Sequence, residues 1–177
     1  FYQVNSAQTE ILYNKAMEFA NLKDGETVID AYCGIGTIGI TAAMNARKAG
    51  RSCRITGVEL NASAVKDAIG NAALNKLDNI RFTCADAGDF MTELAARRER
   101  ADVVFMDPPR TGSDTRFLSC LTRLAPSRIV YISCGPDTLA RDLKYLTRKG
   151  YAVERMSGVD LFPMTKHCEV VCGLTKR

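Results

Sequence analysis

A glycine-rich segment and a single glutamate give the first indication of chemistry. Gly34, Gly36 and Gly39 have the spacing Gly-x-Gly-x-x-Gly, and Glu59 ends the next expected strand. Glycines at this spacing let the backbone approach a ligand closely, and a carboxylate at that position accepts hydrogen bonds from ribose hydroxyl groups. We therefore expect Gly34 and Glu59 to bind a nucleotide-like cofactor, although the same glycines could form only a tight turn.

Three aspartates favour S-adenosylmethionine over NAD as that cofactor. Asp30 ends the first expected strand, where a carboxylate suits an amino group and a sulfonium better than a pyrophosphate. Asp86 follows the third strand and could accept a hydrogen bond from the adenine amine. Asp107 follows the fourth strand and opens the run Asp-Pro-Pro-Arg, at the edge where open α/β sheets bind ligands. An NAD-dependent oxidoreductase remains the alternative from another class.

Cys134 is the cysteine whose position fits a nucleophile. It ends the fifth expected strand, next to the strand that carries Asp107, and a helix begins near Pro136. A helix N-terminus favours an anion, so we expect the pKa of this thiol to be lowered. Cys33 lies in the glycine turn, and four other cysteines are expected to pack as small apolar residues: Cys53, Cys84, Cys120 and Cys172.

Glu169 begins the last expected strand, after a loop that contains Pro163. A carboxylate shielded by a bound base could have a raised pKa that suits it to accept a proton. Position alone leaves two interpretations even, a general base and a solvated glutamate at a strand edge. His167, the only histidine, is the alternative base.

Length and composition indicate one globular domain over residues 1–177. The chain has 46% hydrophobic and 25% charged residues, and a net charge of +4 that allows a polyanionic partner without diagnosing one. No apolar run is long enough for a membrane span, so we expect no membrane contact. Seven cysteines without disulfide or zinc spacing predict a cytoplasmic protein and no metal site. Because the first residue is Phe1, we expect the chain to be a piece of a longer protein.

The elements that must position these residues alternate between strand and helix. A lead-in helix is expected over 6–22, and five strand-helix units follow it. The expected strands are 27–30, 55–59, 80–85, 102–107 and 129–133, with helices ending near Gly50 and at 61–76, 90–97, 114–124 and 136–149. Two closely joined strands, 151–161 and 169–174, must then pair antiparallel. This order predicts an α/β class I S-adenosylmethionine-dependent methyltransferase fold, Rossmann-like, with a mostly parallel sheet.

Five motifs together resemble the RNA (uracil-5-)-methyltransferase family, the bacterial enzymes that form 5-methyluridine in 23S rRNA and tRNA. The resemblance covers essentially all of the chain and indicates the C-terminal catalytic domain. The motifs are Phe-Tyr-Gln-Val-Asn at 1–5, Asp-Ala-Tyr-Cys-Gly-Ile-Gly at 30–36, Asp-Pro-Pro-Arg-Thr-Gly at 107–112, Tyr-Ile-Ser-Cys-Gly-Pro-Asp-Thr-Leu-Ala-Arg-Asp at 131–142 and Phe-Pro-Met-Thr-Lys-His-Cys-Glu at 162–169.

The resemblance implies roles for individual residues. Cys134 matches the nucleophile of the family and Glu169 its general base. The cofactor-binding positions of the family correspond to Gln3, Tyr32, Glu59 and Asp107, with Asp86 as a further contact. The chain departs from the family at Gly135, where Asn is usual, and at Cys168, where an apolar residue is common.

The implied reaction is methylation of carbon 5 of a uridine, with S-adenosylmethionine as donor and S-adenosylhomocysteine as product. The thiolate adds to carbon 6, which makes carbon 5 nucleophilic, and a base then removes the carbon 5 proton. The run Thr138 to Asp142 looks more like the ribosomal members, so we expect rRNA rather than tRNA as partner, and no obligate protein partner. Arg110 and Arg116 are candidates for phosphate contacts. A cofactor-binding RNA module without activity is the third hypothesis.

Family members usually carry an N-terminal RNA-binding barrel, and many bind an iron-sulfur cluster through clustered cysteines upstream. The seven cysteines of this chain are scattered and form no such motif, which agrees with the prediction that it holds no metal.

Overall fold

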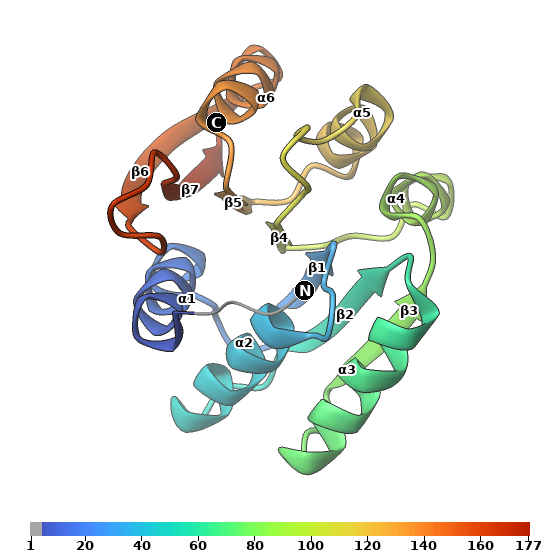
Figure 1. Cartoon of the computed structure of the whole chain (residues 1–177). Coiled ribbons are helices and arrows are strands. Elements are labelled where there is room, and N and C mark those ends of the chain that lie inside the picture. The colour runs from blue at the N-terminus through green and yellow to red at the C-terminus, as the bar shows by residue number, and fades with distance from the viewer. Residues whose placement is uncertain (1–4) are drawn as a thin grey trace.

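The structure is a computed structural model that describes residues 5–177, with a central sheet between two layers of helices (Figure 1). The helices are α1 (Ser6–Ala20), α2 (Thr37–Lys48), α3 (Ala62–Leu74), α4 (Ala87–Ala96), α5 (Thr115–Leu124) and α6 (Pro136–Arg148). The strands are β1 (Thr27–Ala31), β2 (Arg54–Glu59), β3 (Ile80–Cys84), β4 (Val103–Met106), β5 (Arg128–Ser133), β6 (Tyr151–Val159) and β7 (Glu169–Lys176).

The sheet has the order β3-β2-β1-β4-β5-β7-β6. The first five strands are parallel, and β7 inserts antiparallel between β5 and β6. The predicted fold class, a mostly parallel sheet closed by an antiparallel pair, is therefore confirmed. The direction of winding reverses between β1 and β4, and open α/β sheets bind their ligands at the carboxyl ends of such strands.

The strands bury a different hydrophobic cluster on each face, because their side chains alternate. In β4, Val103 and Phe105 join the cluster that includes α1 and α2, whereas Val104 and Met106 join the cluster that includes α5. Figure 1 shows α1, α2 and α3 covering the first face and α4, α5 and α6 the second. Both faces of the sheet are thus covered by helices, and the carboxyl ends of its strands are the place where a site is expected.

Gly36 makes the turn between β1 and α2 possible. Its φ of 83° is strained for any residue with a side chain, and a Cβ there would lie 2.7 Å from the ring of Phe82. Gly36 is also the N-cap of α2, so the helix begins where the backbone turns away from the sheet. No helix within residues 5–177 is long and apolar enough to cross a membrane.

Candidate functional site

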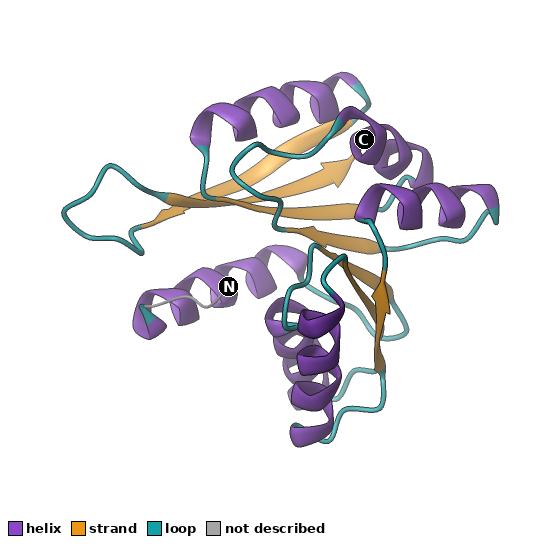
Figure 2. Ribbon diagram, turned by 45° about the vertical axis from the view of Figure 1, so that its right-hand side comes forward, coloured by secondary structure: helices purple, strands orange, loops and turns teal. Residues whose placement is uncertain are grey.

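A cavity of about 900 Å³ opens at the carboxyl ends of β1, β2, β4 and β5. It brings together six of the residues predicted from the sequence: Tyr32, Gly34, Glu59, Asp107, Cys134 and Glu169. The loop that joins β6 to β7 extends beyond the sheet (Figure 2) and contributes Phe162 to the wall. Asp86 is not among the lining residues, and Gln3 lies outside the described residues.

The charge of the cavity is strongly acidic. Its described lining carries four carboxylates, from Glu10, Glu59, Asp107 and Glu169, and one guanidinium, from Arg110. Burial, together with the nearby carboxylates of Glu169 and Asp30, raises the pKa of Asp107 to about 7. A cavity with this balance attracts a cationic ligand and repels an anion such as a pyrophosphate.

Glu59 is held rigidly at the cofactor side of the cavity. One carboxylate oxygen accepts a hydrogen bond from the Gly34 amide at 3.0 Å, and the other accepts one from the Asn61 amide at 2.8 Å. A carboxylate can accept about four hydrogen bonds, so lone pairs remain for a ligand's hydroxyl groups. Glu59 therefore shapes the glycine turn and can also bind the ligand next to it.

Cys134 is half-buried at the end of β5, with Glu169 as a neighbour in the cavity. Burial, then the charges of Glu169 and Asp107, raise the pKa of the thiol, and the Arg110 guanidinium opposes this rise. The expectation that the N-terminus of α6 would lower this pKa was wrong. Burial and the carboxylates of Glu169, which begins β7, and Asp107, which directly follows β4, raise it instead.

Glu169 is buried at the start of β7. Burial raises the pKa of its carboxyl, and Arg110 acts in the opposite direction. A buried carboxylate with a raised pKa is suited to accept a proton from a bound ligand.

The whole chain, residues 1–177, matches a family model described as tRNA (Uracil-5-)-methyltransferase. The chain belongs to this family. It is 47% identical over 176 residues to an uncharacterized RNA methyltransferase of Enterococcus faecalis, covering 99% of the chain and 37% of the relative. It is also 47% identical over 174 residues to an uncharacterized RNA methyltransferase of Halalkalibacterium halodurans, with 98% and 37% covered. The chain thus spans little more than a third of the length of these family members.

A solved structure in the family has the same fold. It is the tRNA (uracil-54, C5)-methyltransferase of Pyrococcus abyssi in complex with S-adenosyl-L-homocysteine, with a TM-score of 0.80 and 36% identity over 99% of this chain and 40% of that chain. NSun6 of Pyrococcus horikoshii, at 14% identity and a TM-score of 0.76, shares the fold alone, over 93% of this chain and 51% of that one.

Two acids expected at the cofactor, Asp30 and Asp86, have hydrogen-bond partners within the scaffold of this chain. Asp30 is buried and does not line the cavity, and one of its oxygens accepts a hydrogen bond from the Gly39 amide at 2.7 Å. Asp86 caps α4 by accepting from the Asp89 amide at 3.0 Å and pairs with Arg116 at 2.7 Å. This cap also explains why α4 begins at Ala87 rather than at the expected Phe90.

Arg116, one of the two candidates for phosphate contacts, is bound by the carboxylates of Asp86 and Asp89. Arg110, the other candidate, lines the cavity. Of the two arginines, Arg110 is therefore the one that faces the reacting groups.

His167 is a weaker candidate for the base than Glu169. It is absent from the described cavity lining, and its ring lies edge-on to Phe162, with 6.3 Å between the ring centroids. Glu169 lines the cavity together with Cys134. The geometry therefore favours the carboxylate.

Helix α1 contributes a cavity wall that its apolar periodicity did not predict. Thr9, Glu10, Tyr13 and Asn14 line the cavity, whereas the sequence predicts only a lead-in helix there. Burial and the charge of Asp107 raise the pKa of Tyr13, so its hydroxyl remains a proton donor near the carboxylates. The polar residues Thr9 and Tyr13, one turn apart, were the signal that could have revealed this face.

Proposed function

We propose that the protein that carries this chain transfers a methyl group from S-adenosylmethionine to carbon 5 of a uridine in RNA. The observation that carries the proposal is that a cysteine and a buried carboxylate, Cys134 and Glu169, share one cavity with the glycine turn and Glu59. Membership of the uracil-5 methyltransferase family supports it. Carbon 5 methylation requires a thiol, a base and a cofactor site in one cavity.

The cavity fits S-adenosylmethionine better than NAD. Glu59 would accept hydrogen bonds from the ribose, and the backbone at Gly34 would lie close to the ligand. A Cβ at Gly34 would have no neighbour within 4 Å, which leaves room for a ligand there. The acidic lining suits a sulfonium and an amino group and would repel a pyrophosphate. When bound, S-adenosylmethionine supplies an electrophilic methyl group. Tyr32, Asp107, Gln3 and Asp86 stay proposed cofactor contacts.

Cys134 and Glu169 divide the chemistry between them. The Cys134 sulfur, once deprotonated, adds to carbon 6 of the uracil, and the electron pair of the ring double bond makes carbon 5 nucleophilic. After methylation of carbon 5, Glu169 takes the proton from that carbon, the double bond re-forms and the sulfur leaves. The thiolate is thereby regenerated, Glu169 passes its proton to solvent, and the net change on the RNA is a methyl group in place of a hydrogen.

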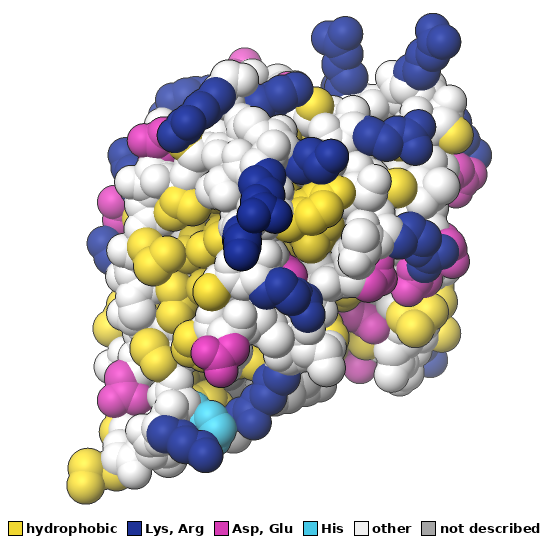
Figure 3. Space-filling model, turned by 90° about the horizontal axis from the view of Figure 1, so that it is seen from above, with side chains coloured by type: hydrophobic (Ala, Val, Ile, Leu, Met, Phe, Trp, Pro, Cys, Tyr) yellow, Lys and Arg dark blue, Asp and Glu magenta, His cyan; other side chains and the backbone are white. Residues whose placement is uncertain are grey.

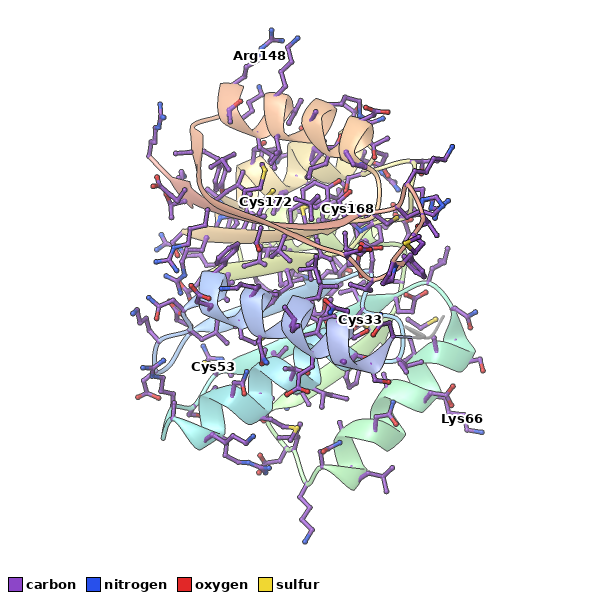
Figure 4. The ribbon with its side chains drawn as sticks, turned by 60° about the vertical axis from the view of Figure 1, so that its left-hand side comes forward. Cys33, Cys53, Lys66, Arg148, Cys168 and Cys172 are labelled. Carbon is purple, nitrogen blue, oxygen red and sulfur yellow. The ribbon has the colours of Figure 1, made fainter. Side chains whose placement is uncertain are left out.

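The RNA class remains part of the proposal. The run Thr138 to Asp142 led us to expect rRNA, whereas the family model and the P. abyssi relative are named for tRNA. Figure 3 looks onto the side of α5 and α6 and shows Lys and Arg side chains spread over it. Arg148 points outward from α6 in Figure 4. Lys and Arg side chains on this face suit the phosphate backbone of either RNA, and we propose the cytoplasm as the location of the reaction.

The test is a methylation assay on both RNAs. The protein is incubated with S-adenosylmethionine and with tRNA or 23S rRNA transcripts, and the digested nucleosides are analysed by mass spectrometry. We expect 5-methyluridine from one RNA and none from Cys134→Ala. Absence of 5-methyluridine from both, with cofactor binding intact, would support an RNA module without activity. Binding of NAD instead of S-adenosylhomocysteine in calorimetry would support the oxidoreductase.

A further inference from the structure

Two of the sequence motifs, 107–112 and 131–142, contact each other through the first half of α6. The Arg141 guanidinium donates to the carbonyls of Thr111 at 3.1 Å and Ser113 at 3.0 Å. The carboxylate of Asp142 accepts from the Ser113 amide at 2.8 Å. The loop after β4, residues 110–113, is therefore bound to α6 by the side chains of Arg141 and Asp142, which lie near the middle of that helix.

Asp142 is the centre of these contacts. It is fully buried, and besides the Ser113 amide it accepts from the Tyr131 hydroxyl at 2.7 Å and from the Arg141 guanidinium at 2.8 Å. A buried carboxylate with this many donors is a rigid anchor, since losing any donor leaves charge without compensation. Gly112 fits against it with a φ of 74°, and a Cβ there would lie 2.8 Å from the carboxylate.

Thr138 connects this anchor to the turn that carries the thiol. Its hydroxyl lies 3.0 Å from the Arg110 carbonyl and 3.0 Å from the Gly135 carbonyl. Gly135 directly follows Cys134, and a Cβ at Gly135 would lie 2.8 Å from the same hydroxyl and 3.1 Å from the Arg110 carbonyl. One hydroxyl thus spans the backbone of Arg110 and the turn of Cys134, and the glycine leaves room for it.

We propose that Thr138, Arg141 and Asp142 are positioning residues that hold the loop of Arg110 against the turn of Cys134. Their purpose is to keep the Arg110 guanidinium beside the thiol and Glu169. The importance of the Cys134 thiol rests on the proposed function, but the placement of Arg110 does not.

The consequence is chemical as well as structural. Arg110 is the cation of the described cavity lining, and it opposes the rise in the pKa of both Cys134 and Glu169. If the loop shifts, that opposition weakens and the thiolate becomes rarer at neutral pH. Loss of the contacts should therefore appear in the titration of Cys134 even where the fold is intact.

The experiment measures alkylation of Cys134 by iodoacetamide against pH, by peptide mass spectrometry on the protein that carries this chain. In Thr138→Val and Asp142→Asn we expect the alkylation rate at pH 7 to fall by about three-fold, which corresponds to about half a unit in the pKa of the thiol. Arg110→Gln should give a fall at least as large. Thr138→Ser keeps the hydroxyl and should restore the wild-type profile.

Double variants in the Arg110→Gln background distinguish a loss of Arg110 positioning from a general loosening of the fold. Adding Thr138→Val or Asp142→Asn to this background should change the profile no further, because the cation they position is already gone. A further fall in the double variants, or a wild-type profile in both single variants, would overturn the proposal. Asp142→Asn removes a buried charge and could unfold the protein, so Thr138→Val, at a partly exposed site, provides the test in that case. If Cys134→Ala still methylates RNA, the proposed function fails, yet the alkylation profile still decides the role of Thr138.

Discussion

At Cys134, burial of the thiol and the helix behind it act in opposite directions. The N-terminus of α6 favours a thiolate, whereas burial and the carboxylates of Glu169 and Asp107 favour the neutral thiol, and the net pKa is raised. The sequence shows the helix because Pro136 follows closely. It does not show the carboxylates, which arrive from strands far away in the chain. The thiol therefore needs help to ionise, and Arg110 is placed to give it.

The order of the proposed steps predicts that the nucleophile and the base fail differently. In Glu169→Gln the Cys134 sulfur can still add to carbon 6 and carbon 5 can still take the methyl group. The variant cannot remove the carbon 5 proton, so a methylated protein-RNA adduct should accumulate. A denaturing gel with RNA and S-adenosylmethionine should show it as a slowly migrating band. Cys134→Ala should give neither band nor product.

The double variant Cys134→Ala/Glu169→Gln is the control, and it should show no adduct. His167→Ala tests the alternative base in the same gel. Normal turnover by Glu169→Gln, with adduct accumulating in His167→Ala, would assign the base to the histidine instead.

A second prediction at the level of one residue concerns the cofactor affinity of Glu59→Ala. Glu59→Ala removes the acceptor of the Gly34 amide and the proposed acceptor for the ribose, so S-adenosylhomocysteine should bind more weakly by about 1.5 to 3 kcal/mol. Calorimetry measures this difference directly. Glu10→Ala, which removes a carboxylate from the α1 wall of the cavity, controls for the loss of charge alone. Unchanged affinity in Glu59→Ala would refute the assignment.

At the level of elements, replacing Gly36 or Gly70 with alanine should change stability in opposite directions. A Cβ at Gly36 would strike Phe82 in a left-handed backbone, whereas Gly70 in α3 has nothing within 4 Å of its added Cβ. Gly36→Ala should therefore lower the free energy of unfolding by about 1 to 3 kcal/mol. Gly70→Ala should raise it by about 0.5 to 1 kcal/mol, because alanine favours the helix. Denaturant unfolding checks both, and equal effects would contradict the role given to the turn.

The elements that periodicity defines were predicted well. The alternation of strands and helices and the antiparallel end were readable because each element carries its own apolar pattern, as Val103 to Met106 does in β4. The role of each element in the candidate site was harder to predict. α1 forms a cavity wall, and Asp30 and Asp86 hold a turn and a helix end, because these roles depend on which distant residues each side chain meets.

For the whole molecule, the burial of acids in the cavity and beneath the glycine turn next to it opposes folding. Asp107 and Asp30 both have a pKa raised to about 7, because burial disfavours their charge. Each of these carboxyls keeps its proton in the folded chain at a pH where the unfolded chain has lost it. The same acidity that suits a cationic cofactor therefore reduces stability at neutral pH, a trade typical of functional sites. That residues 1–177 form one catalytic domain of a longer protein stays a prediction.

Asp107→Asn should reveal this conflict through its dependence on pH. Between the ordinary value of 3.8 and about 7, the folded state binds the proton of Asp107 and the unfolded state does not, so wild-type stability falls as pH rises through that window. An asparagine cannot ionise. The variant should therefore gain stability over the wild type as pH rises, by up to about 4 kcal/mol at pH 8 relative to pH 4. Asp67→Asn, at an exposed site of α3, controls for the loss of one charge. Urea unfolding at both pH values measures the difference. If the difference in the free energy of unfolding between Asp107→Asn and wild type stays constant with pH, the pKa of Asp107 is not raised in the folded state. The gain in stability should come with weaker binding of S-adenosylmethionine, because the asparagine has lost the charge that attracts a sulfonium.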